Sequence, residues 1–457
     1  MGPRLVRKKI LGTYPMTNLN EEKSTCRIAF VNQGCRLNQA ETAAVESAFW
    51  KESGYDIVAA TDPADVVIVN TCTVTENSDT DTRKLLSKLG RLNPGVKVAL
   101  IGCQAQIFKE KLLDMPHVQW VIGNADKMGI KAFIEAEDTL THVPKLTRKP
   151  FTVALTAMDR GHTRANLKIQ DGCDFYCSFC IIPFARGPAR SRVFEDLMRE
   201  AKILVESGFK ELIVTGINVG TYNHDGKNIT DVIDALAELP GLTRIRVSSI
   251  EPTTIPMDLI ARMADPTHPL CPYLHIPIQS GSETILRRMQ RKYTLTEFVQ
   301  FINDVIAVVP NISIGTDVIV GFPGETDALF EETRELLTAL PFSYFHVFSY
   351  SERSLARSQK LDGQVAHADI HQRSEILRAL SQVKKKAYAR QFIGSTQPVL
   401  FEKPKRGVSQ GLTPHYVRVQ LSNPGDTPPT PNTVQDVQIT GIEGDGLVGV
   451  MPPVKSS

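Results

Sequence analysis

The sequence predicts an α/β protein that ends in a small all-β domain. From residue 26 to residue 392, short apolar runs alternate with segments of helical periodicity, which is typical of parallel sheets covered by helices. Beyond residue 393 the helical periodicity stops and short strand-like segments follow one another. The chain of 457 residues is long enough for roughly three domains of about 150 residues each.

The first α/β series is expected to form a domain over residues 26–140. Apolar runs at 27–31, 66–69, 96–101 and 118–122 are the expected strands, and 41–51, 82–92 and 108–113 are the expected helices. Short buried strands separated by helices predict an open parallel sheet of flavodoxin-like type. Residues 1–25 contain basic side chains and no apolar run, so we expect a disordered tail there and no secretory signal.

The second series is expected to form a domain over residues 157–392. Its strands are expected at 167–170, 211–215, 244–249, 273–277, 313–320 and 345–350, with helices between them and a long closing helix at 371–392. Six such repeats predict a partial (β/α)6 barrel, whose active site lies at the carboxyl ends of the strands. Residues 393–457, with strands expected at 398–401, 416–421, 437–442 and 447–451, are expected to form a small β-barrel.

Composition narrows the possible partners and compartments. The formal net charge is only +2, so any nucleic-acid-binding surface must be local. No apolar run approaches the length of a membrane span. Eight cysteines in a chain without an export signal are expected to stay reduced in the cytoplasm, where clustered cysteines are typical of metal sites or catalysis.

Three cysteines stand in a CxxxCxxC pattern directly after the first strand of the second series. Cys173, Cys177 and Cys180 can wrap one compact cluster, and soft sulfur ligands select iron–sulfur or zinc. A structural zinc would need a fourth ligand, and the nearest histidine, His162, lies upstream across the expected strand. A four-iron cluster with three ligands leaves one iron open. The alternatives are structural zinc and three ordinary buried cysteines.

The segment LKIQDGCDFYCSFCII (residues 167–182) resembles the radical S-adenosylmethionine superfamily. This resemblance implies that the open iron binds the amino and carboxylate groups of S-adenosylmethionine, and that one electron then releases a 5′-deoxyadenosyl radical. The segments TGINVG, SSIEP, HIPIQSGS and TDVIVGFPGET also resemble that family, at the ends of expected strands. They imply cofactor contacts at Thr215, Gly216, Glu251, Gln279 and Asp317.

A second set of cysteines follows the strands of the first series. Cys35, Cys72 and Cys103 each come at or near the end of an expected strand, and such ends converge on one crevice of a parallel sheet. From spacing alone, three coincidentally placed core cysteines remain an alternative. The segments GCRLNQAET, NTCTVTENSD and GCQAQ resemble the methylthiotransferase family, which implies a second 4Fe–4S cluster held by these three cysteines. Cys26 and Cys271 match no such segment and are expected to be small buried side chains.

The same resemblance implies a reaction that converts a C–H bond to C–S–CH3, with a second S-adenosylmethionine as methyl donor and a cellular one-electron donor of flavodoxin or ferredoxin type. GCRLN, NTCTVT and GLTPHYVRV look like the branch that acts on N6-threonylcarbamoyladenosine next to the anticodon of tRNA. The stretch from residue 399 to 421 resembles the RNA-binding barrel called TRAM. The alternatives are action on isopentenyl-adenosine in tRNA or on a ribosomal-protein aspartate, and a non-catalytic RNA-binding metalloprotein.

Contacts with RNA are expected from local basic and aromatic groups, because five Lys/Arg and five Asp/Glu balance each other after residue 393. A basic group past the cysteine motif and two residues of the small barrel are the candidates. They are Arg186, Arg190, Arg192, Tyr416 and Arg418. The alternatives are a solvated charged face for the arginines and a core position for Tyr416.

Overall fold

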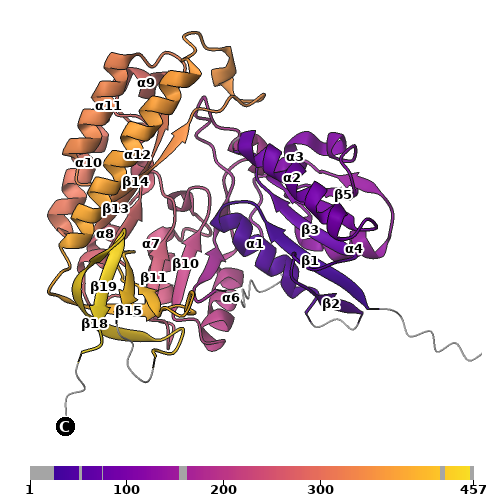
Figure 1. The fold of residues 1–457 in the computed structure, drawn as a ribbon, viewed down its shortest axis with the longest axis horizontal. Coiled ribbons are helices and arrows are strands. Elements are labelled where there is room, and N and C mark those ends of the chain that lie inside the picture. The colour runs from indigo at the N-terminus through magenta and orange to yellow at the C-terminus, as the bar shows by residue number, and fades with distance from the viewer. Residues whose placement is uncertain (1–24, 51–53, 75, 154–161, 423–427, 453–457) are drawn as a thin grey trace, which may run out of the picture.

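The computed structural model describes residues 25–50, 54–74, 76–153, 162–422 and 428–452. The tail expected over residues 1–25 lies, apart from Thr25, outside the described residues. Figure 1 shows the N-terminal α/β domain beside the larger barrel domain, with the small C-terminal barrel at the lower edge of the latter. No helix among the described residues has the length and apolar character needed to cross a membrane.

The N-terminal domain is built on six parallel strands in the order β2-β1-β3-β4-β5-β6. This is the flavodoxin-like order extended by one edge strand, which confirms the predicted fold type. Central strand β3 is buried along its whole length, as expected for a parallel strand covered on both faces. The strands are β1 Cys26–Asn32, β2 Tyr55–Ile57, β3 Val66–Thr71, β4 Lys97–Gly102, β5 Val118–Ile122 and β6 Leu140–His142.

All three helices expected in this domain begin earlier than expected; α2 starts at Glu76 instead of residue 82, and the other two begin at or next to a cysteine. Helix α1 starts at Arg36 instead of residue 41, and α3 starts at Cys103 instead of residue 108. Their first turns contain polar side chains such as Asn38 and Gln104, which hide the apolar periodicity although both are 1% exposed. The helices are α1 Arg36–Ser47, α2 Glu76–Leu92, α3 Cys103–Phe108 and α4 Ile130–Glu135.

The second domain has six parallel strands in sequence order, which confirms the partial (β/α)6 barrel. Two three-stranded sheets, β11-β10-β7 and β12-β13-β14, are joined by single bridges such as Ser249 to His275. A short antiparallel pair, β8 Gln170–Asp171 and β9 Arg190–Ser191, stands beside the first sheet. The barrel strands are β7 Ala165–Lys168, β10 Glu211–Thr215, β11 Arg244–Val247, β12 Tyr273–His275, β13 Ser313–Val320 and β14 Tyr344–Ser349.

Helices cover the outside of this barrel (Figure 1). Two of them start with capping boxes that satisfy the free backbone N–H groups of the first turn, Asn228 with Asp231 and Thr294 with Glu297. The helices are α5 Ile182–Arg186, α6 Phe194–Glu206, α7 Ile229–Ala237, α8 Met257–Ala264, α9 Glu283–Arg288, α10 Leu295–Val308, α11 Asp327–Ala339 and α12 His367–Arg390.

The C-terminal domain is a closed barrel in the order β15-β16-β17-β19-β18, which confirms the predicted small β-barrel and adds the strand β16 to the four that were expected. Helix α12 leads into it, and Tyr388 and Phe392 pack in its core. Two arginines of β11 attach it to the larger barrel: Arg244 donates to the carbonyl of Leu412 and Arg246 to that of Pro414, each at 2.8 Å. The strands are β15 Thr396–Phe401, β16 Gln410–Leu412, β17 Arg418–Leu421, β18 Val434–Glu443 and β19 Gly446–Val450.

Candidate active site

The first cysteine group lies where the strand order of the N-terminal sheet reverses. Cys35 follows β1, Cys72 follows β3 and Cys103 follows β4, and these three strands are neighbours in the sheet. Burial raises the pKa of the Cys103 thiol, and the nearby thiols of Cys72 and Cys35 raise it further. The three sulfur atoms therefore converge on one crevice, as the positions of the expected strands predicted.

The second group lies in the loop that follows β8. The backbone N–H of Phe175 donates to Cys173 Sγ at 3.4 Å, and Arg291 Nη1 donates to Cys177 Sγ at 3.3 Å. Burial raises the pKa of Cys173 to about 11 and that of Cys180 to about 12, and the neighbouring thiols of the group add to both shifts. Cys177 is buried and the other two are half-buried, and three neighbouring thiols that would repel one another as thiolates need a bound cation to become ligands.

In neither cysteine group do the three sulfur atoms all lie close enough together to hold a single metal ion. Among the described residues, only one group of three Cys, His, Asp or Glu brings its ligand atoms within 4.8 Å of one another, and it contains no cysteine. A single tetrahedral zinc would hold its sulfur ligands about 3.8 Å apart. Neither cysteine group among the described residues meets that spacing, and the all-sulfur donor sets fit 4Fe–4S clusters, each with one iron that has no protein ligand.

A cavity of about 550 Å³ is formed by all three domains. It is lined by Cys35 of the first cysteine group, by residues at the carboxyl ends of the barrel strands, and by residues of the small barrel. The structure thereby brings together five of the residues singled out from the sequence besides Cys35: Thr215, Gly216, Asp317, Tyr416 and Arg418.

Several buried polar atoms of this lining have no partner. Thr215 Oγ1, Ser248 Oγ and His415 Nδ1 lack a hydrogen bond among the described residues. Unsatisfied buried polar atoms are rare in folded proteins and indicate that a polar ligand completes the site. Since Thr215 and Ser248 lie at or just past the ends of β10 and β11, the site fits S-adenosylmethionine at these strand ends.

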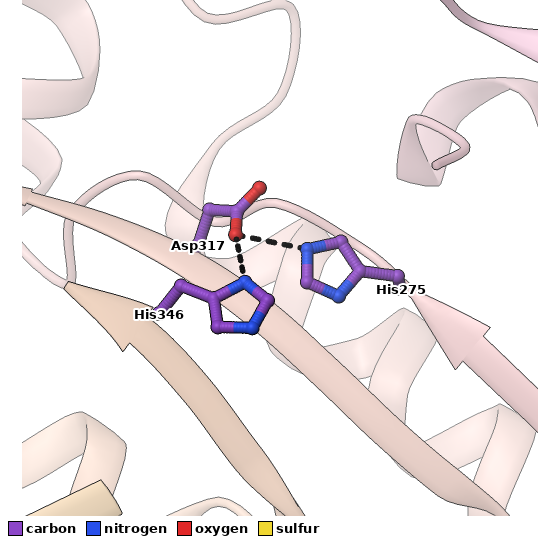
Figure 2. A group of neighbouring side chains, drawn as sticks. All are labelled: His275, Asp317 and His346. Carbon is purple, nitrogen blue, oxygen red and sulfur yellow. Dashed lines mark hydrogen bonds and ion pairs between the residues drawn. The ribbon is translucent and has the colours of Figure 1, made fainter. Parts of the chain in front are cut away.

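Asp317 of β13 stands between two histidines that come from the neighbouring strands (Figure 2). Its Oδ1 lies 2.9 Å from His275 Nε2 and 3.1 Å from His346 Nδ1. Burial alone would raise the pKa of Asp317, but the hydrogen bonds with the two imidazoles hold it well below its usual range. These three side chains are the group whose ligand atoms lie within 4.8 Å, so they are also able to hold a divalent cation.

A line of hydrogen bonds and ring contacts continues from this group to the small barrel. The Tyr344 hydroxyl lies 3.3 Å from His275 Nδ1 and 2.7 Å from the Tyr273 hydroxyl, and the Tyr273 ring lies 4.9 Å from that of Tyr416. His275, His346 and Tyr344 were not among the site residues predicted from the sequence. His275 stands inside the segment HIPIQSGS, so a signal for it was present, whereas nothing in the sequence marked His346.

Comparison with known proteins gives the family. Residues 167–337 match the Radical SAM superfamily, and residues 27–123 match the family described as Uncharacterized protein family UPF0004. A threonylcarbamoyladenosine tRNA methylthiotransferase, MtaB of Bacillus subtilis (strain 168), is 36% identical over 414 residues, which are 87% of this chain and 91% of that protein. The chain belongs to the radical SAM methylthiotransferase family.

Further relatives of this methylthiotransferase have names that specify different substituents on the modified adenosine. MtaB of Aquifex aeolicus (strain VF5) is 34% identical, and the alignment covers 79% of this chain and 89% of that protein. A tRNA-2-methylthio-N(6)-dimethylallyladenosine synthase of Jannaschia sp. (strain CCS1) is 31% identical, and the alignment covers 95% of this chain and 96% of that protein. Among solved structures, TsrM, a radical S-adenosylmethionine methyltransferase from Kitasatospora setae, is 12% identical with a TM-score of 0.52 over 71% of this chain and 75% of that one, which shows a shared fold.

Two further predicted cofactor residues of this methylthiotransferase lie outside the lining of the main cavity. Glu251 forms an ion pair with Arg291, the same side chain that donates to Cys177. Burial raises the pKa of Glu251 more than Arg291 lowers it. Gln279 has a left-handed backbone (φ 73°), and its N–H donates to the Asp317 carbonyl at 2.8 Å. Glu251 is thus tied to the radical-forming cysteine loop, and Gln279 fixes the backbone beside Asp317.

The structure corrects the expectation that Arg186 and Arg192 contact RNA. Both are 0% exposed: Arg186 pairs with Glu41 and Asp171 at 3.0 Å, and Arg192 pairs with two carboxylates of helix α6, which begins two residues later. Carboxylates elsewhere in the fold neutralise these charges in the interior, so neither guanidinium faces solvent. Arg190 is nearly buried and pairs with Asp171 at 3.2 Å, although it lines a second cavity of about 300 Å³ with Cys173. Cys271 is buried as expected, and Cys26 is half-buried.

Arg186 belongs to a buried ionic network between the two cysteine groups of this methylthiotransferase. Glu41 of α1 accepts from Lys127, from Lys168 at 2.7 Å and from Arg186 at 3.0 Å. Burial would raise the pKa of Glu41, but the three cations hold it well below its usual value. Lys168 also binds Asp171, two residues before Cys173. The network therefore fixes the N-terminal domain against the loop that holds the second cysteine group.

Proposed function

We propose that this methylthiotransferase converts the C2–H bond of N6-threonylcarbamoyladenosine, next to the anticodon of tRNA, to C–S–CH3. The observation that supports it best is the composition of the main cavity. One wall holds Cys35, another holds the unsatisfied strand-end atoms of Thr215 and Ser248, and the third holds Tyr416 and Arg418 of the small barrel. The activity named for the MtaB relatives from two bacteria supports the same substrate.

Each group of residues has a separate task in this proposal. When bound, the cluster at Cys173, Cys177 and Cys180 and S-adenosylmethionine supply a carbon-centred radical that removes hydrogen from an unactivated C–H bond, and the second cluster supplies sulfur. The chain's own contribution is to hold ligands and exclude water. Arg291 donates to Cys177 and steadies its sulfur, and Thr215 and Ser248 offer hydrogen bonds to the cofactor. Tyr416 offers an aromatic face to the base.

The proposal includes a partner and a compartment. The reaction requires an electron from a cellular donor of flavodoxin or ferredoxin type, and tRNA and that donor both meet the protein in the cytoplasm. The second candidate, methylthiolation of a ribosomal-protein aspartate, would place a protein segment in the same cavity.

Deletion of the gene is expected to remove 2-methylthio-N6-threonylcarbamoyladenosine from total tRNA. Nucleosides from digested tRNA of the deletion strain and its parent are compared by mass spectrometry, and complementation with the intact gene is the control. Persistence of this nucleoside contradicts the proposed substrate. Loss of a ribosomal methylthio-aspartate instead would support the second candidate.

Anaerobic reconstitution is expected to give about eight irons per chain, because each cysteine group takes one four-iron cluster. Changing Cys35, Cys72 and Cys103 to Ala together is expected to leave about four irons, still with 5′-deoxyadenosine production on reduction. Iron is measured by chemical assay and 5′-deoxyadenosine by chromatography. Bound zinc without cleavage of S-adenosylmethionine would favour a non-catalytic metalloprotein.

A further inference from the structure

Three cationic side chains line the main cavity, and they differ in their partners. Arg418 pairs with Glu402 at 3.0 Å, and Lys385 pairs with Asp445. Arg36, which directly follows Cys35, has no carboxylate partner among the described residues. Among the described residues, its one side-chain hydrogen bond is the one that it donates to the Tyr416 hydroxyl.

The surroundings of Tyr416 add positive potential to this corner of the cavity. The guanidinium groups of Arg36, Arg246 and Arg164 lie 5.3, 5.0 and 5.7 Å from the centre of its ring. Burial would raise the pKa of the Tyr416 phenol, but these arginines outweigh burial and lower it. Arg246 and Arg164 both pair with Glu211, and Arg164 also pairs with Glu402, whereas Arg36 has no carboxylate partner among the described residues.

A half-buried guanidinium without an anion is unfavourable, and it favours a ligand that supplies one. The threonylcarbamoyl substituent ends in a carboxylate, whereas a dimethylallyl substituent is uncharged and apolar. Arginine binds a carboxylate through two parallel N–H donors, and the bond to Tyr416 leaves other donors of Arg36 available. The N6 substituent and C2 lie on the same edge of adenine, so an anion held at Arg36 keeps C2 near Cys35.

We infer that Arg36, oriented by Tyr416, binds the threonyl carboxylate of the substrate and thereby selects threonylcarbamoyl- over dimethylallyl-adenosine. This inference rests on the proposed function. Arg36 and Tyr416 come from different domains, so the selecting pair forms only when the N-terminal domain and the small barrel are both in place.

The test compares two anticodon stem-loop RNAs on the reconstituted, full-length enzyme. One carries N6-threonylcarbamoyladenosine, and the other carries its methyl ester, which removes the negative charge. Fluorescence anisotropy under anaerobic conditions gives both dissociation constants. The wild-type enzyme is expected to bind the acid roughly ten- to a hundredfold more tightly than the ester, in the range of a hydrogen-bonded charge. Arg36→Gln is expected to bind both RNAs equally.

Two further variants separate a direct contact from a general loss of structure. Arg36→Lys keeps the charge and is expected to retain part of the preference for the acid, whereas Tyr416→Phe removes the orienting hydroxyl and is expected to reduce that preference severalfold. The matched control is Arg418→Gln, which removes a cavity arginine that already has a carboxylate partner. This variant is expected to weaken the binding of both RNAs alike and to leave the ratio of their dissociation constants unchanged.

The outcomes distinguish this inference from the proposed function, because methylthiolation of the acid stem-loop is measured in parallel. Turnover by the wild-type enzyme without a preference for the acid, or a preference that survives in Arg36→Gln, overturns the role of Arg36 and leaves the function intact. A preference that is lost in Arg36→Gln, with no turnover by the wild type, supports the contact and overturns the function.

Discussion

Replacing Cys177 with Ala is expected to abolish production of 5′-deoxyadenosine from S-adenosylmethionine. Cys177 is one of the three proposed sulfur ligands, and it is the one that Arg291 fixes by a hydrogen bond at 3.3 Å. Two remaining cysteines cannot hold a four-iron cluster with a single open iron. Without cleavage, methylthiolation of a stem-loop RNA is expected to be lost as well. Both products are measured on anaerobically reconstituted protein.

The comparison with Cys72→Ala separates the tasks of the two cysteine groups. That variant is expected to lose sulfur insertion and to retain part of the cleavage, because Cys72 belongs to the group at the edge of the N-terminal sheet. Cys26→Ala, at a cysteine outside both groups, is the control and is expected to keep both activities. Equal loss of cleavage and insertion in Cys72→Ala would argue that its cluster only relays electrons or supports the fold.

Changing Glu41 to Gln is expected to lower the free energy of unfolding by about 3–5 kcal/mol, as for other broken buried ion pairs. The change leaves Lys127, Lys168 and Arg186 without the carboxylate that they share. Because the pKa of Glu41 lies well below its usual value, its contribution is complete above about pH 4.3 and is lost as the pH falls through the depressed pKa of the folded state. Urea denaturation of the variant and the wild type at neutral pH measures the decrease in the free energy of unfolding.

Glu46→Gln on the same helix is the matched control. Glu46 is only partly buried and accepts a hydrogen bond from Trp50, which a glutamine can also accept. A change within about 0.5 kcal/mol is expected there, as for other substitutions away from the core. The double variant with Glu41→Gln and Lys127→Met removes one stranded cation and is expected to recover part of the stability. If Glu41→Gln alone were as stable as the wild type, the network would not hold the two domains together.

Strands β10 and β13 were predicted to the residue, and β10 carries an apolar run at residues 212–214. Burial on both faces leaves a continuous apolar signal in the sequence. The edge strands β2 and β6 were missed because three half-exposed residues give no such signal. The early starts of α1 and α3 were missed because their first turns bury polar side chains against other parts of the fold.

The grouping of the cysteines into two sets was predictable from spacing and from their places after strands, whereas the partners of the charged residues were not. Arg186 was expected at an RNA surface because its sequence neighbours are basic, but its main partner, Glu41, stands 145 positions earlier in the chain. Arg36 was visible in the segment GCRLN, yet its isolation from carboxylates and its bond to Tyr416, 380 positions away, arise only from tertiary structure.

The attachment of the small barrel through Arg244 and Arg246 affects the order of steps in tRNA binding. An RNA-binding module on a flexible tether could capture tRNA first and deliver the base later, in two separable steps. Here the hydrogen-bonded carbonyls belong to residues 412–414, immediately before His415 and Tyr416 in the cavity wall. Docking of the anticodon loop and seating of its modified base therefore become a single encounter, and the residence time of the tRNA is also the time available for chemistry.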